Sequence, residues 1–190
     1  MKKYIVGITG ASGSIYGIRL AEEILKAKNE VFIVITDNGQ KVMKYETGFE
    51  LNSVLKRLEG FGKVNLCDIN DLFAPIASGS FKVEGMVIAP CSMSAIGRIS
   101  NGISLNLLDR AADVCIKEKR KLIVVPREMP FNTIHLENML KLSKSGAVIL
   151  PASPGFYNKP QSLDDIINFV VSRILDNLDI ENNISKRWRD

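Results

Sequence analysis

Residues 4–27 read YIVGITGASGSIYGIRLAEEILKA, and this stretch decides the fold. An apolar run over residues 4–8 leads into a glycine-rich turn, and apolar residues then recur at helical spacing over residues 15–27. A glycine-rich turn between a strand and a helix often holds a phosphate, because backbone N–H groups and the positive end of the helix face it. Ser12 and Ser14 add hydroxyl donors, so we expect an anion-binding loop rather than a bare tight turn.

The glycines of this turn do not have the spacing of a dinucleotide-binding motif. They give G-x-x-G-x-x-G, and Ile8 stands where the tight-turn glycine of G-x-G-x-x-G belongs. Asp37 follows the next apolar run, where an acid would bind the ribose of a dinucleotide. Thr36 and Asp37 are equally typical of helix capping, so an NAD-dependent reductase is the less favoured interpretation.

Further along the chain, short apolar runs alternate with helical patterns. None of the runs alternates polar with apolar residues, as expected of strands covered on both faces. This order predicts a parallel sheet, and right-handed crossovers restrict it to an α/β fold of the Rossmann-like doubly wound type. We expect three layers, α/β/α, with about six parallel strands in the order 3-2-1-4-5-6. The apolar runs cover residues 4–8, 31–35, 86–90, 122–126 and 147–151, with a weaker run at 63–66, and the helical patterns cover 15–27, 105–117, 134–142 and 162–178.

The composition is typical of a soluble globular protein, with 46% hydrophobic and 24% charged residues. The net charge is only +4 and no basic tract stands out, which argues against a nucleic-acid surface. The three cysteines are scattered and odd in number, which indicates reduced thiols rather than disulfides or a zinc site. No run has the length of a signal peptide core or a membrane span, so we expect a cytoplasmic protein without a membrane partner.

Ligands of such sheets bind beyond the carboxyl ends of the strands, so the residues after each apolar run are candidates. After residues 86–90, Ser92 and Ser94 stand where a helix begins, which gives a second helix N-terminus at the same edge. Cys91 is either a nucleophile or a small packed thiol. We favour the packed thiol, because the one histidine of the chain, His135, lies in another segment.

Arg127 and Glu128 directly follow residues 122–126. An arginine at this edge suits a phosphate or the carbonyl edge of a flavin, and a glutamate suits general acid–base chemistry. The alternative is a surface ion pair of little energetic value. Pro126 and Pro130 bracket the two residues and stiffen the segment, which favours a functional role.

Three further segments carry polar or aromatic residues of interest. The turn over residues 78–80, Ser-Gly-Ser, is small and rich in donors that suit an anion. The loop with Phe156 and Tyr157 is suited to form a lid over a ring. Arg173 falls on an apolar helical stripe, where it either extends to solvent or grips an anion. Together these elements fit a flavin mononucleotide and a second phosphate ligand, with no metal-ligand cluster.

Six motifs are specific to one family. They are GITGASGSIYGIRL, APIASGS, PCSMSAIG, NLLDRAADVCIKEKRKLIVVPRE, HLENMLKLSKSGAVILPASPGFYNKPQSLDDIINFVVSRILDNL, and the RW near the C-terminus. Together they resemble the UbiX-type flavin prenyltransferases, a family long described as aromatic acid decarboxylases. The resemblance covers nearly the whole chain.

The resemblance implies an enzyme that joins the dimethylallyl group of dimethylallyl phosphate to N5 of reduced FMN and closes a ring at C6, without a metal. It implies a homo-oligomer of trimers, commonly a dodecamer, with an active site shared between subunits. The product, prenylated FMN, would serve a UbiD-type decarboxylase. We expect one flavoprotein domain over residues 1–178 and a C-terminal extension over residues 179–190.

The resemblance also assigns roles to positions that match the family in residue type. It implies catalytic roles for Glu46, Glu128 and Ser12. The implied FMN-binding residues are Gly10, Ala11, Ser12, Thr36, Ser92, Met93, Ser94, Ala95 and Arg127. The implied residues around dimethylallyl phosphate are Ser78, Gly79, Arg110, Lys117, Tyr157 and Arg173. Leu72 or Phe73 stands where the family often has a tryptophan, so the prenyl-binding wall is left open.

Within this interpretation the cationic side chains stabilise the departing phosphate, and Glu128 moves a proton between phosphate and flavin. Two alternatives remain. One is a non-catalytic FMN-binding subunit of an aromatic acid decarboxylase complex, which would not require Glu46, Glu128, Lys117 and Arg173 together. The other is a flavin-dependent cysteinyl decarboxylase, whose loop before the fourth strand carries a histidine where this chain reads ASGS. The choice between a monophosphate and a pyrophosphate donor stays open.

Overall fold

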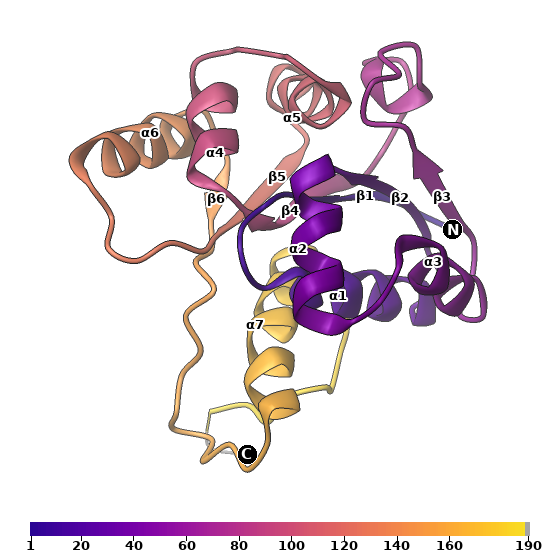
Figure 1. The fold of residues 1–190 in the computed structure, drawn as a ribbon, viewed down its shortest axis with the longest axis vertical. Helices are drawn as coiled ribbons and strands as arrows, with labels where there is room; N and C mark the ends of the chain where they lie inside the picture. The colour runs from indigo at the N-terminus through magenta and orange to yellow at the C-terminus, as the bar shows by residue number, and fades with distance from the viewer. Residues whose placement is uncertain (189–190) are drawn as a thin grey trace.

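The computed structural model describes residues 1–188, and its strands form a single parallel sheet (Figure 1). The strands are β1 (Lys3–Ile8), β2 (Glu30–Ile35), β3 (Val64–Cys67), β4 (Gly85–Cys91), β5 (Lys121–Pro126) and β6 (Val148–Ile149). Their order is β3-β2-β1-β4-β5-β6, and neighbouring strands pair in parallel. The predicted six-stranded doubly wound topology is therefore confirmed.

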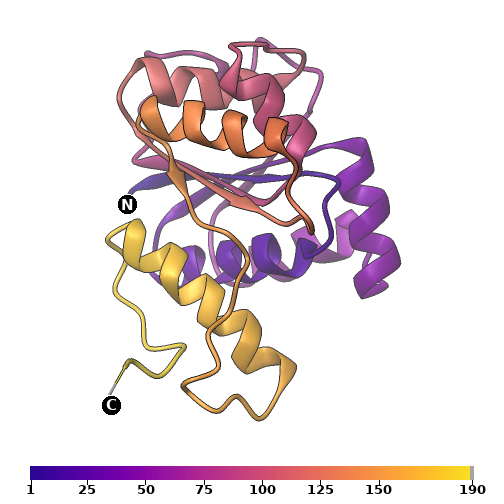
Figure 2. The ribbon, with the colours of Figure 1, turned by 90° about the vertical axis from the view of Figure 1, so that its left-hand side faces the viewer.

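Helices cover both faces of the sheet, which gives the predicted three layers (Figure 2). On one face lie α1 (Ser14–Lys26), α3 (Leu51–Glu59) and α7 (Leu163–Asn177). On the other lie α4 (Met93–Ser100), α5 (Leu107–Lys117), α6 (Thr133–Lys144) and the short turn η1 (Pro75–Ala77). The remaining helix, α2 (Asp37–Thr47), follows β2 at the carboxyl edge of the sheet.

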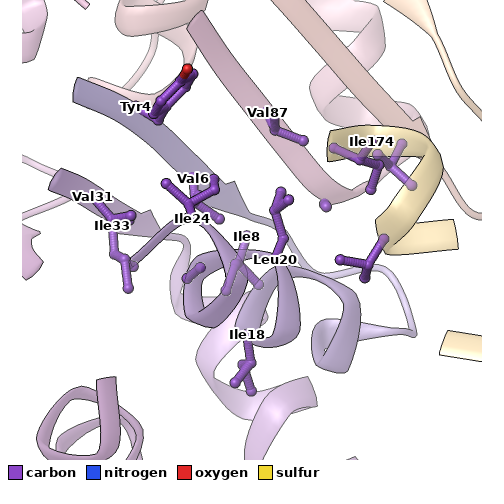
Figure 3. Packing of buried hydrophobic residues seen from close by; sticks show 14 of the residues in the cluster. Tyr4, Val6, Ile8, Ile18, Leu20, Ile24, Val31, Ile33, Val87 and Ile174 are labelled. Carbon is purple, nitrogen blue, oxygen red and sulfur yellow. The ribbon is translucent and has the colours of Figure 1, made fainter. Parts of the chain in front are cut away.

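The hydrophobic core has two halves, one on each side of the sheet. Successive residues of a strand point to opposite faces, so Val6 and Ile8 of β1 join one half and Ile5 joins the other. Figure 3 shows Val6 and Ile8 beside Leu20 and Ile24 of α1. Because both faces are covered by helices, the central strands are apolar along nearly their whole length after a charged first residue in β1, β2 and β5, and this is the unbroken apolar run seen in the sequence.

α1 approaches the sheet closely at Gly17. A methyl group at this position would collide with the carbonyl oxygen of Ala89 and would lie 2.8 Å from Cγ1 of Ile8. The glycine therefore lets the helix lie directly against β1 and β4. This contact places the N-terminus of α1 at the carboxyl edge, where β1 ends.

The predicted elements are present, with differences at their ends. α1, α5, α6 and α7 match the four predicted helical patterns, and α7 begins with the predicted capping box of Ser162 and Asp165. The strand predicted over residues 147–151 is reduced to the two residues of β6 at the edge of the sheet. α2 and α3 are additional elements that the apolar patterns did not predict.

The chain continues beyond α7 along the same layer. Ile180 is buried in the core and Ile184 packs against it, so the proposed extension begins in contact with the domain. Arg189 and Asp190, the last two residues of that extension, lie outside the described residues. Among the helices of residues 1–188, none combines the length and apolar character that a membrane span requires.

Candidate active site

A crevice of about 540 Å³ opens at the carboxyl edge of the sheet, between the ends of β1, β2 and β4. The strand order reverses between β1 and β4, and this reversal point is where open α/β sheets bind ligands. Four of the predicted FMN-binding residues, Gly10, Thr36, Ser92 and Ser94, line the crevice. The structure thus brings together residues from three separate loops.

Among the helices that begin at this crevice are α2 and α4, and a polar side chain caps each of these two. Thr36 caps α2 by accepting a hydrogen bond from the Gly39 N–H at 3.0 Å, and Ser92 caps α4 through the Ala95 N–H at 3.3 Å. The capping interpretation of Thr36 is thereby confirmed, and Asp37 lies beside it in the crevice wall. The hydroxyls of Ser92 and Ser94 lie 3.1 Å apart and complete a row of donors for an anion.

The glycine-rich loop carries a carboxylate of the chain itself. Glu46, at the end of α2, accepts hydrogen bonds from the Gly13 N–H at 3.0 Å, the Ser14 N–H at 3.3 Å and the Ser14 hydroxyl at 3.0 Å. Partial burial alone would raise the pKa of Glu46, but the hydrogen bonds from Ser12, Gly13 and Ser14 outweigh burial and lower the pKa. Glu46 therefore caps α1 as a stable anion.

Arg127 approaches the same loop from the end of β5. Its Nε donates a 3.3 Å hydrogen bond to the backbone carbonyl of Ser12. Ser12, Glu46 and Arg127, which come from three different elements, therefore meet beside the N-terminus of α1. Glu128 follows Arg127 on the exposed loop, where its Oε1 accepts a hydrogen bond from the Met129 N–H at 3.1 Å. Its carboxylate thus faces solvent next to the arginine.

Four residues predicted to bind the second phosphate gather around η1 and α5. Arg110 donates from Nε to the carbonyl of Ala77 at 3.2 Å, which holds its guanidinium against the turn. The hydroxyl of Ser78 lies 2.8 Å from that of Ser80. Lys117 forms an ion pair with Glu118 directly over the backbone of Gly79. Ser78, Gly79, Arg110 and Lys117 thus lie together, and each of the two cations is paired with a carboxylate, Arg110 with Asp113 and Lys117 with Glu118.

The other two predicted phosphate-binding residues, Tyr157 and Arg173, lie on α7 and its preceding loop. The ring of Tyr157 packs edge-on against Phe169, with 5.6 Å between ring centroids. Arg173 was placed on the apolar stripe from its spacing, but it lies between two buried residues with its side chain 56% exposed. It extends to solvent, as one of the two predicted alternatives states, and its guanidinium pairs with Asp176 at 2.8 Å.

The two groups of predicted phosphate-binding residues lie on opposite faces of the sheet. The α5 group belongs to the layer of α4, α5 and α6, whereas the α7 group belongs to the layer of α1 and α7 (Figure 2). The sheet separates them, so one chain does not assemble the complete set of predicted residues.

Several crevice residues were not predicted from the sequence. Lys41 and Asn106 lie in its wall. Arg98 holds the buried carboxylate of Asp109 with contacts of 2.7 and 3.1 Å, and Asp109 also accepts from the Leu105 N–H. This buried pair fixes the loop that closes one side of the crevice. The residues of such a pair lie on different helices, so no local spacing marks them.

The predicted packed thiol at Cys91 is confirmed. Cys91 is fully buried at the end of β4, and burial raises the pKa of its thiol far above the ordinary value. A thiol of this kind is not available as a thiolate nucleophile. Within residues 1–188, no group of three His, Cys, Asp or Glu side chains is arranged to hold a metal ion.

Comparison with known proteins agrees with this fold and crevice. The model of the flavoprotein family matches residues 1–175, so the chain belongs to that family. The flavin prenyltransferase UbiX of Halalkalibacterium halodurans is 52% identical over 97% of this chain and 92% of its own length. The UbiX of Methanocaldococcus jannaschii is 50% identical over 98% of each chain. Within the flavoproteins, the chain is a member of the UbiX flavin prenyltransferases.

Solved structures give the same result. The crystal structure of AnUbiX (PadA1) in complex with FMN and dimethylallyl pyrophosphate is 36% identical, with a TM-score of 0.94 over 100% of this chain and 98% of that one. A dodecameric FMN-dependent UbiX-like decarboxylase from Escherichia coli O157:H7 is 40% identical, with a TM-score of 0.92 over 99% and 100%. The FMN-dependent cysteine decarboxylase TvaF is 16% identical with a TM-score of 0.64, so the likeness extends to the fold alone.

Proposed function

We propose that this protein transfers the dimethylallyl group of dimethylallyl phosphate to N5 and C6 of reduced FMN and releases phosphate. The observation that carries the proposal is the meeting of Ser12, Glu46 and Arg127 beside a crevice at the reversal point of the sheet. A protein that only stored FMN would not need a charged carboxylate there. The cysteinyl decarboxylase alternative has only fold-level likeness in its favour.

The crevice suits FMN in size and in its polar groups. It has about 540 Å³ of space, and the hydroxyls of Ser92 and Ser94 and the ammonium of Lys41 surround it. A methyl group at Gly10 would lie only 2.8 Å from Cβ of Asn38, so the glycine allows the loop after β1 to approach the start of α2 this closely. We propose that Gly10–Ser12, Thr36, Ser92–Ala95 and Arg127 hold the flavin. The flavin, when bound, supplies the nucleophilic nitrogen and carbon that receive the prenyl group.

The phosphate of the donor needs cations where its negative charge develops. Arg110 and Lys117 supply two from the α5 group, and Arg173 supplies one from the α7 group, with Tyr157 as a hydroxyl donor. Arginine and lysine at a departing phosphate lower the barrier because they stabilise charge that is greater in the transition state. In the free chain the ion pair with Glu118 fixes the position of the Lys117 ammonium. To bind the phosphate, Lys117 must break this ion pair.

We assign the proton transfer to Glu128 and a fixed negative charge to Glu46. Glu46 is held by three donors of the α1 N-terminus, which fixes its position and keeps it ionised. Glu128 is exposed beside Arg127 and free to reorient, as a residue that moves a proton between flavin and phosphate requires.

We further propose that the active site is completed by a second copy of the chain. The two phosphate-binding groups lie on opposite faces of one sheet and come together only if α5 of one subunit meets α7 of another. α6 offers an apolar surface for such contacts, since Ile134, Leu136 and Leu140 are each more than half exposed. The assembly we propose is a trimer-based oligomer, as in the dodecameric relative, and it passes prenylated FMN to a UbiD-type decarboxylase in the cytoplasm.

One experiment tests this function directly. The full-length protein is incubated anaerobically with reduced FMN and dimethylallyl phosphate, and the flavin is weighed by mass spectrometry. We expect the flavin mass to rise by one isoprenoid unit, with inorganic phosphate released in equal amount. A parallel reaction without the prenyl donor should leave the mass unchanged. Bound flavin of unchanged mass in the complete reaction would instead identify an FMN-storage protein.

A further inference from the structure

The segment after α7 folds back along the helix and along the loop before it. Asp176, in the last turn of α7, receives both ends of the Arg187 guanidinium, at 2.5 Å and 2.8 Å. The Asn182 side chain donates to the same carboxylate at 3.1 Å. Asn158, in the loop before α7, donates to the carbonyl of Lys186 at 2.6 Å. The segment is therefore tied both to the last turn of α7 and to the loop before that helix.

These ties place Trp188 against a residue of the proposed phosphate-binding group. The rings of Trp188 and Tyr157 meet edge-on with 4.9 Å between centroids. Tyr157 thus lies between Phe169 on one side and Trp188 on the other, which restricts its ring. The Arg187–Asp176 pair and the Asn158–Lys186 hydrogen bond anchor the backbone that leads into Trp188.

Asp176 acts on the other phosphate-binding residue as well. Its Oδ2 accepts from Arg173 at 2.8 Å, so one carboxylate orients two guanidiniums. The side chain of Asp176 is only 19% exposed, whereas that of Arg173 is 56% exposed. One negative charge against two positive charges leaves the group cationic toward solvent. A cavity of about 130 Å³, bordered by Tyr157, Arg173, Arg187 and Trp188, lies at this point and has room for a phosphate group.

We propose that Asp176 and Arg187 are positioning residues for the prenyl donor. They orient Arg173 directly and hold Tyr157 through Trp188, so they set the affinity for the donor's phosphate without touching the flavin. The proposal rests on the proposed function, because it assigns Tyr157 and Arg173 to the phosphate. It differs from a purely structural role for the C-terminal segment, which would affect flavin and donor alike.

The test compares Asp176→Asn and Arg187→Gln with Asp179→Asn. Asp179 is a matched control, since it pairs with Lys121 on the surface only three residues beyond Asp176. Trp188 is the only tryptophan of the chain, so its fluorescence anisotropy in the flavin-free protein reports directly on the segment. We expect the anisotropy to fall in Asp176→Asn and Arg187→Gln and to stay at the wild-type value in Asp179→Asn. Arg187→Lys should keep an intermediate value, because it preserves the charge but not the two-pronged geometry.

Steady-state kinetics on the same variants decide the role. We expect the KM for dimethylallyl phosphate to rise roughly tenfold in Asp176→Asn and Arg187→Gln, as for the loss of a charge-assisted contact, while the KM for FMN is unchanged. Far-ultraviolet circular dichroism verifies that each variant is folded. Equal rises in both KM values, or wild-type values for both, would overturn the positioning role while the proposed function stands. A wild-type protein that leaves the flavin unchanged would overturn the proposed function and the inference with it.

Discussion

Glu46 shows how one residue can serve a fold and a site at once. The first turn of any helix has N–H groups without partners, and the positive end of the helix dipole favours an anion there. In this chain the anion is the carboxylate of Glu46, which lies at the end of α2 and accepts hydrogen bonds from the N–H groups at the start of α1. The positive end of α1 therefore already has an anionic partner. We expect the phosphate of a flavin to bind instead at the N-termini of α2 and α4, beside Thr36 and Ser92.

Glu128 has the exposure of an acid–base residue rather than of a structural one, and replacing it by glutamine tests this role. We expect Glu128→Gln to bind FMN normally and to lose roughly a hundredfold or more in turnover, because the amide cannot carry the proton. The measurement is the rate of prenylated FMN formation with flavin binding followed in parallel. Glu59→Gln, on the exposed end of α3, is the matched control and should retain full activity. A normal rate in Glu128→Gln would exclude the acid–base role.

At the residue scale, the sequence predicted four of the residues that line the crevice but not the contacts between distant residues. Glu46 and Gly13 are 33 residues apart in the chain, and Ser12 and Arg127 are 115 apart. Contacts of this kind depend on the packing of whole elements, so spacing along the chain does not reveal them. Arg173 was expected either to extend to solvent or to grip an anion, and in the single chain its side chain extends to solvent beside Asp176.

At the scale of elements, α1 is the helix that links the sheet to the site. Its N-terminus donates to Glu46 of α2 and follows directly after Ser12, and its middle packs against β1 and β4 at Gly17. The position of the glycine-rich loop therefore depends on how closely this helix can approach the sheet. Any residue that pushed α1 outward would also move the loop.

Gly17→Ala tests this close approach. In an open helical position alanine would stabilise by up to about 1 kcal/mol, but here its methyl group collides with the Ala89 carbonyl. Overpacking of this kind costs about 1–3 kcal/mol, and a backbone oxygen cannot move aside easily. We expect the free energy of unfolding to fall by about 2 kcal/mol, measured by urea denaturation.

Gly97→Ala in α4 is the control for this substitution. The nearest atom to its new methyl group would be Nδ2 of Asn138 at an ordinary 3.5 Å, so the helix propensity gain should remain. We expect Gly97→Ala to be neutral or slightly stabilising. Equal stability changes in the two variants would show that the approach of α1 is not limited by Gly17.

Of the two helices that were not predicted, α2 buries only Gly39 and Met43 and shows no recurring apolar stripe. α3 does carry one, since Leu51, Val54, Leu55 and Leu58 recur at helical spacing, and this signal could have found the helix. The central strands were clear because they are buried on both faces. α6 was also clear, yet among its predicted apolar residues only Met139 and Leu142 are buried within the chain. The other apolar residues of the pattern, Ile134, Leu136 and Leu140, form a surface that is exposed in the single chain.

At the scale of the whole molecule, the division of the phosphate-binding residues between two faces leads to a test by mixing. Lys117→Ala lacks a residue of the α5 group and Arg173→Ala lacks one of the α7 group, so each variant alone should be nearly inactive. If α5 of one subunit meets α7 of another, mixed oligomers contain some sites in which both groups are intact.

We expect activity to reappear when the two inactive variants are dissociated, mixed and reassembled, up to roughly a quarter of the wild-type value for random pairing. The readout is prenylated FMN formed per subunit. Mixing Lys117→Ala with a Lys117→Ala, Arg173→Ala double variant is the control and should restore nothing. No recovery in the first mixture, although the variants exchange subunits, would place the whole site within one chain.

The sheet that separates the two groups also shapes how the sequence can change. Residues that touch one another usually vary together among relatives, because a change at one is compensated at the other. With the proposed arrangement, positions on α5 and α7 share a single phosphate although the full thickness of the domain lies between them in each chain. Their substitutions should then be correlated like those of neighbours. A map of correlated positions would then contain pairs of residues that are far apart in the single chain. Those pairs would identify the interface between subunits.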